Sequence, residues 1–256
     1  MLIRRVIGKV RSQDWSALVS ELIIVILGIF IAIQADSWWQ AHNDRKLEQQ
    51  YVSRLIDDVN IDIASIEYGI ALAELRKELA DILIAAADNP ESVRDHAIMF
   101  LIAVRQAAFT YTPSLNSDTF EELKATGKLA LLGDENLKAA LFEYYRFDQS
   151  QRQFMSLQLR QEFRHFEVMA NVLSNRQDSW VQDNYPVIRP EQVPEANESL
   201  AGIEDIVSAA ARLANKPDAV DWLSEARGMQ LDSIATNQSR LQRATALLQL
   251  LETPEI

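Results

Sequence analysis

Residues 17–39 read ALVSELIIVILGIFIAIQADSWW, and this stretch decides the fold class of the chain. Its centre, Leu22–Ala35, carries no charge. As a helix the centre is about 21 Å long, and extending it back to Ala17 gives about 28 Å, which is enough to cross the hydrocarbon core of a bilayer. We therefore predict a transmembrane helix over residues 17–39.

The tryptophans on either side of this stretch support the prediction. Trp15 precedes the apolar run, and Trp38 and Trp39 follow it. Trp15 and Trp38 are about 35 Å apart along a helix, close to the distance between two bilayer interfaces, where aromatic residues anchor membrane helices. A buried helix of a soluble protein rarely has these flanks. A cleaved signal peptide is disfavoured because Ile33 is too large for the small-residue pattern, so we expect an uncleaved anchor.

The charges around the predicted span indicate its orientation. The net charge is −12, but residues 1–19 sum to +3, which leaves −15 for the remainder. Four basic residues precede the span (Arg4, Arg5, Lys9 and Arg11), and three follow it closely (Arg45, Lys46 and Arg54). The positive-inside rule favours a basic cytoplasmic N-terminus over residues 1–16. In a bacterium the span would cross the inner membrane, and residues 40–256 would form a periplasmic domain.

One face of the predicted span carries small residues at helical spacing. The stripe repeats at four and three residues and consists of Glu21, Val25, Gly28, Ala32 and Ala35. A small-xxx-small pair such as Gly28 and Ala32 permits close approach of a second membrane helix. Chance is the alternative, since Gly and Ala are common in spans. Glu21 either reaches the interface or pairs with a partner inside the membrane.

The rest of the chain is predicted to be all-α. It contains only 7 Gly and 7 Pro, and no Pro precedes Pro90, so turns are few and helices long. The span is expected to continue as a stalk helix to about Ala87, with a joint near residues 42–44. An apolar seam at four–three spacing marks this stalk: Val52, Ile56, Val59, Ile63, Ile66, Ile70 and Ala73. The seam fits internal packing in a bundle or a parallel dimer contact.

Further helices are expected over residues 91–108, 134–175, 199–215 and 218–252, with a surface loop over 176–198. Gly127 is expected to end a short helix in a left-handed conformation. Together with the stalk these segments predict one extramembrane helical bundle over residues 40–256.

Three segments carry a resemblance to a known family. They are ELIIVILGIFIAIQADSWWQ, RKLEQQYVSRLIDDVNID and TFEELKATGKLALLGDENLKAALFEYY, all within residues 20–150. They resemble an uncharacterised family of bacterial single-span membrane proteins with a helical extramembrane domain. The resemblance implies the topology above and no established activity, so it assigns no catalytic residue.

Motifs for chemistry are scarce. The chain has no Cys, no Walker loop and no nucleophile elbow. Glu162 and His165 form one E-x-x-H motif, but a di-iron bundle needs two, so a structural His165 is expected. Asp57, Asp58 and Asp62 are interpreted as a solvated acidic face, and Tyr144 and Tyr145 as core residues. We expect no cofactor and no metal, and nucleic acid is a poor candidate because no basic stripe exists.

These patterns predict a membrane-anchored interaction or scaffold protein without catalytic activity. Its expected partners are the lipid bilayer and either a second copy or another membrane subunit. The first alternative is a periplasmic sensory or ligand-binding module that signals through a partner protein. A metal-dependent bundle enzyme is the weaker alternative.

Overall fold

The computed structural model describes residues 15–152, 155–194 and 205–253. Within these ranges the protein has eight α-helices, three short 3-10 helices and no strand. The predicted all-α fold is therefore confirmed.

The chain divides into two compact units, Met1–Ser53 and Arg54–Ile256. The predicted bundle domain begins earlier, at residue 40. Helix α2 (Trp15–Asp88) contributes to both units and is helical through residues 42–44. The prediction that the apolar stretch and the stalk belong to one helix is thus confirmed.

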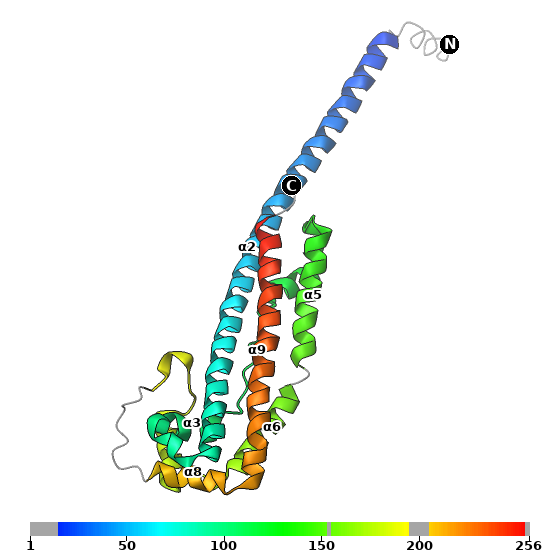
Figure 1. The fold of residues 1–256 in the computed structure, drawn as a ribbon. Helices are drawn as coiled ribbons and strands as arrows, with labels where there is room; N and C mark the ends of the chain where they lie inside the picture. The colour runs from blue at the N-terminus through cyan, green and yellow to red at the C-terminus, as the bar shows by residue number, and fades with distance from the viewer. Residues whose placement is uncertain (1–14, 153–154, 195–204, 254–256) are drawn as a thin grey trace, which may run out of the picture. The chain divides into compact units, whose positions relative to one another are not determined.

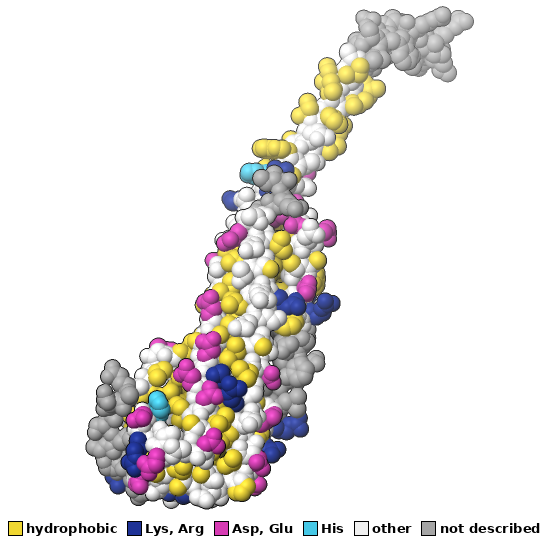
Figure 2. Space-filling view, viewed as in Figure 1, with side chains coloured by type: hydrophobic (Ala, Val, Ile, Leu, Met, Phe, Trp, Pro, Cys, Tyr) yellow, Lys and Arg dark blue, Asp and Glu magenta, His cyan; other side chains and the backbone are white. Residues whose placement is uncertain are grey.

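In the first unit, α2 exposes its apolar side chains. Ten large hydrophobic residues between Leu22 and Ile33 are 50–68% exposed. Figure 2 shows these side chains as yellow groups around the first part of the helix. This segment is long and apolar enough to cross a membrane. Trp38 and Trp39 are 71% and 61% exposed.

The second unit is a helical bundle (Figure 1). After α2, its elements are η1 (Pro90–His96), α3 (Ala97–Gln106), α4 (Asp118–Ala125), η2 (Lys128–Leu131), α5 (Glu135–Arg152), α6 (Met155–Met169), α7 (Asn175–Asn184), η3 (Pro190–Gln192), α8 (Ile206–Ala214) and α9 (Pro217–Glu252). Helix α9 packs on α5, α6 and α8, while α3 packs on α6 and α7. The main apolar core is formed mostly by residues of α2, α3, α8 and α9, such as Leu83, Phe100, Leu213 and Leu223.

The structure corrects two of the predicted helix boundaries. Residues 91–108 are not one α-helix, because Asn89 caps a 3-10 helix with its side chain accepting from the Glu91 N–H. The helix expected to reach residue 175 ends at Met169, and Asn171 takes a left-handed φ of 65°. A left-handed residue cannot continue a right-handed helix.

The loop expected over residues 176–198 is wrong in its first part, where α7 forms. Ser174 begins α7 with a capping box, in which its hydroxyl accepts from the Gln177 N–H and the Gln177 side chain accepts from the Ser174 N–H. Helix α8 begins at Ile206, with Asp205 as its N-cap, and the expected helix start at residue 199 lies outside the described residues. Gly127, with φ 70°, has the expected left-handed conformation.

Candidate functional site

The most unusual feature of the bundle is a set of polar side chains in its interior. On α2 one stripe of buried positions follows a four–three repeat: Leu55, Val59, Asp62, Ile66, Gly69, Ala73, Arg76, Ala80 and Leu83. Asp62 and Arg76 are 1% and 4% exposed. Buried charged groups are costly unless they are paired or hydrogen-bonded, so these residues need partners.

The predicted seam shares only part of this stripe. Val59 and Ile66 are fully buried within the chain, and Ala73 is buried too. Ile56, Ile63 and Ile70 are half-buried, at the edge of the packed face. Val52 belongs to the first unit. The buried members of the seam therefore pack inside this chain.

The partner of the polar stripe is the segment 107–117, between α3 and α4, which we call the inner loop. Ala107, Ala108, Pro113 and Leu115 are buried. Loops usually run over the surface because their backbone N–H and C=O groups need hydrogen bonds. In this bundle, side chains of four helices supply those bonds.

The first part of the inner loop is bound by α9 and α6. Gln230 of α9 donates from Nε2 to the carbonyl oxygens of Ala107 and Phe109, both at 2.9 Å. The Glu162 carboxylate of α6 accepts from the Thr110 N–H at 2.9 Å and from the Thr110 hydroxyl at 3.2 Å. Both helices are therefore tied to one short stretch of backbone.

Arg76 of α2 adds a third helix to the same stretch. Its guanidinium donates to the Phe109 carbonyl at 3.3 Å and lies 5.8 Å from the Phe109 ring centre. Burial lowers the pKa of Arg76 to about 10, against the opposing effect of the Glu162 carboxylate. Arg76 is therefore still charged at neutral pH.

Arg240 of α9 holds the middle of the inner loop. It is 1% exposed and donates to the Pro113 carbonyl at 2.6 Å and to Asn237 Oδ1 at 3.3 Å. Gly69 permits this arrangement, because a Cβ there would lie 3.3 Å from Asn237 Nδ2 and 3.5 Å from Pro113 Cδ. The loop and α9 both come close to α2 at this glycine.

Asn116 ends the inner loop with bonds to α2 and α5. Its N–H donates to Asp62 Oδ1 at 2.7 Å, and its side-chain amide donates to Asp58 Oδ1 at 2.8 Å. Tyr145 donates to the Asn116 carbonyl, and Tyr144 donates to Asp62 Oδ2, both at 3.0 Å. The solvated acidic face is thus wrong for Asp58 and Asp62, whereas the two tyrosines are buried as predicted.

The Tyr144 hydroxyl donates its proton to the buried carboxylate of Asp62. Burial, followed by the negative charge of Asp62, raises the pKa of the Tyr144 phenol, so it remains a protonated donor.

Tyr144→Phe should lower the free energy of unfolding by about 1–3 kcal/mol, because a buried carboxylate oxygen loses a bond. Urea unfolding followed by circular dichroism measures this. Tyr111→Phe, at an exposed position, is the matched control; equal losses in both variants would contradict the assignment.

The E-x-x-H motif has a structural role in this bundle. Glu162 binds Thr110 as described, and His165 bridges two other helices. Trp222 Nε1 of α9 donates to His165 Nδ1 at 3.0 Å, and His165 Nε2 lies 3.1 Å from the Val104 carbonyl of α3. Across the described residues, no group of three or more Asp, Glu or His side chains is placed to hold a metal ion.

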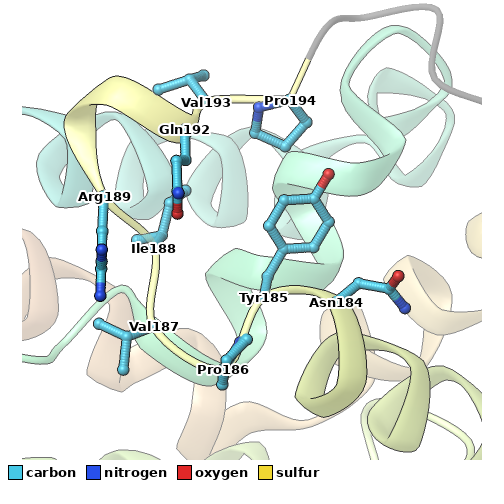
Figure 3. A pocket seen from close by; sticks show the side chains of 9 residues that line it. All are labelled: Asn184, Tyr185, Pro186, Val187, Ile188, Arg189, Gln192, Val193 and Pro194. Atoms are coloured by element: carbon cyan, nitrogen blue, oxygen red, sulfur yellow. The ribbon is translucent and has the colours of Figure 1, made fainter.

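A surface hollow of about 730 Å³ lies in the segment after α7 (Figure 3). Gln106 shapes it, since its side chain accepts from the Ile188 N–H at 2.8 Å and donates to the Tyr185 carbonyl at 2.7 Å. Tyr185, Arg189 and Gln192 are polar residues at its wall. Every lining residue comes from the one stretch 184–194, so the hollow joins no distant elements.

The predicted membrane residues lie in the first unit. Glu21, Val25, Gly28, Ala32 and Ala35 are all exposed, and their spacing places them on one helix face. The interface residues Trp38 and Trp39 are exposed as well, while the side chain of Trp15 lies outside the described part. Residues 1–14 of the predicted basic N-terminus also lie outside it.

The chain matches no protein-family model, no curated protein and no solved structure. The resemblance to single-span bacterial membrane proteins stays a prediction.

Proposed function

We propose that this protein is a single-pass, membrane-anchored helical scaffold whose second unit presents a rigid surface to partner proteins. The observation that carries the proposal is the uncovered apolar segment of α2. Its ten large hydrophobic side chains between Leu22 and Ile33 are half-exposed or more. A contiguous apolar surface of this kind indicates contact with a membrane or another protein.

The length and transfer energy of this segment favour a bilayer. Residues 17–39 are about 34 Å long as a helix, which is enough to cross the hydrocarbon core of a bilayer, about 30 Å thick. The ten large side chains favour insertion by about 3–6 kcal/mol in total on the insertion scale. The basic residues before the segment support a cytoplasmic N-terminus and a second unit on the opposite side, periplasmic in a bacterium.

The interior of the second unit supports a structural role. Asp62 and His165 are buried and Glu162 is half-buried, and each binds a neighbouring helix or the inner loop. Hydrogen-bonded polar networks of this kind favour one well-defined arrangement. The proposed partners are a second copy or another membrane subunit, and no catalytic activity is proposed.

Crosslinking in native membranes followed by mass spectrometry tests the scaffold. We expect crosslinked partners for the wild type and their loss in Gly28→Leu, which enlarges the small-residue stripe. A side chain at Gly28 meets nothing within 4 Å in the chain, so the fold itself is not disturbed. Ile26→Leu, on another face, is the control. A monomeric protein without any crosslinked partner would contradict the proposal.

A further inference from the structure

His165 is a fully buried histidine whose two ring nitrogens both bind other helices. The Trp222 indole N–H is only a donor, so His165 Nδ1 must accept from it. The proton of the neutral ring is then on Nε2, which donates to the Val104 carbonyl. The bond from α9 therefore requires the neutral ring, whereas the bond to α3 uses the Nε2 proton that both forms of the ring carry.

A second proton on His165 would disrupt this link. It would add an N–H at Nδ1, directly against the N–H of Trp222, and place a positive charge in the interior. Burial lowers the pKa of His165 to about 4, although hydrogen bonds to the Val104 and Ala103 carbonyls oppose this effect. The neutral ring is the stable form inside the bundle.

The charged groups on the packed helices do not offset that positive charge by direct contact. On α6, Glu162 binds Thr110, and the Arg164 guanidinium lies 5.1 Å from the Trp222 ring centre. Arg105 of α3 pairs with Asp178. From α9, Asp218 and Asp221 line an outer hollow with Arg164.

We infer that His165 is an acid-operated latch: its protonation at Nδ1 breaks the bond from Trp222 and puts a charge in the interior, so that α6 leaves α3 and α9 while the rest of the second unit stays folded. Among the described residues, α6 also contacts the inner loop through the Glu162–Thr110 bonds and the edge contact of Phe166 with Phe109, at 5.4 Å between ring centres. Arg105 of α3 lies over the Phe166 ring, and Arg164 lies over the Trp222 ring of α9. The main core is built mostly from α2, α3, α8 and α9, so it can persist without α6.

The direction of the pH effect follows from proton binding. A released His165 titrates near 6.5, whereas the latched ring titrates near 4. Between these values the released form binds more protons, so stability of the latched form is complete above about pH 6.5 and falls as the pH decreases. Each pH unit below 6.5 shifts the equilibrium up to about tenfold toward release, reaching about 160-fold near pH 4 and a limit of about 300-fold below it.

Hydrogen exchange of the full-length protein in nanodiscs tests the latch. Amide protection of residues 155–169, corrected for the intrinsic pH dependence of exchange, should fall by up to about 40-fold from pH 6.5 to 4.5. Protection of the α2 segment 72–83 should not change over this range. His165→Gln, which cannot titrate, should abolish the change, while His96→Gln at an exposed position should preserve it.

Three results would overturn the latch. They are pH-independent protection of α6 in the wild type, simultaneous loss of protection in α6 and in residues 72–83, and an unchanged pH dependence in a folded His165→Gln variant. If His165→Gln already leaves α6 unprotected at pH 7, this variant cannot report a pH dependence. The pH dependence of α6 protection in the wild type then distinguishes the latch from the first two results. Trp222→Phe removes the opposing N–H and should then reduce the wild-type pH effect.

Discussion

Arg240→Met is expected to lower the free energy of unfolding of the helical unit by about 1.5–3 kcal/mol, the loss typical of removing a hydrogen bond from a charged group. Arg240 is 1% exposed, and its bond to the Pro113 carbonyl is 2.6 Å long. Methionine fills similar space but donates nothing, so this carbonyl stays buried without that donor. Because domains have net stabilities of about 5–15 kcal/mol, the loss is a large share of the total.

Arg243→Met on the same helix is the matched control for Arg240→Met. Arg243 pairs with Glu143 at 2.7 Å, but its side chain is 37% exposed. Exposed pairs contribute about 0–1 kcal/mol, so this variant should unfold close to the wild type in urea. Equal destabilisation by both substitutions would show that the inner loop does not depend on Arg240.

The double variant Ile26→Arg with Phe30→Arg is expected to abolish stable membrane insertion. Each arginine at the centre of a span costs about 2.5–3.5 kcal/mol, so the two together exceed the total gained from the apolar side chains. The fraction of protein retained in membranes after alkaline carbonate extraction measures the effect. Asp44→Arg, beyond Trp39 on the same helix, should leave retention unchanged. Full retention of the double variant would contradict a spanning helix.

Much of the helical architecture follows from simple patterns in the sequence. The apolar run and the absence of proline before Pro90 were enough to predict a span over residues 17–39 that continues as one helix to about Ala87, and α2 ends at Asp88. Gly127 was enough to predict a left-handed helix end. In these cases a local preference of the chain agrees with the final fold.

The register of the buried α2 stripe could not be predicted in the same way. Periodicity selects the apolar series that contains Ile56, Ile63 and Ile70, whereas the bundle buries Asp62, Gly69 and Arg76 in their place. These polar and small residues are buried because the inner loop packs on them and needs donors and acceptors. Which loop lies on a helix is a tertiary fact that a single helix pattern does not contain.

The same reason explains why the candidate site was missed on α9. Gln230, Ser233, Asn237 and Arg240 follow a three–four–three spacing, which places them on one face of the helix. A hydrophobicity pattern assigns such a face to solvent. Polar residues at helical spacing opposite a Pro-containing loop were the available signal. For α7, the missed signal was local, since Ser174 and Gln177 match a capping box.

Labelling of introduced cysteines in intact cells tests most directly whether the chain crosses a bilayer once. The natural chain has no cysteine, so single substitutions give unambiguous signals. With a membrane-impermeant maleimide, Ser53→Cys and Ser224→Cys, both exposed positions, should react from the outer face of the inner membrane. Ser12→Cys should react only after lysis, and Val25→Cys in neither case. Rapid labelling of Val25→Cys, or labelling of Ser12→Cys and Ser224→Cys from the same side, would contradict the membrane anchor.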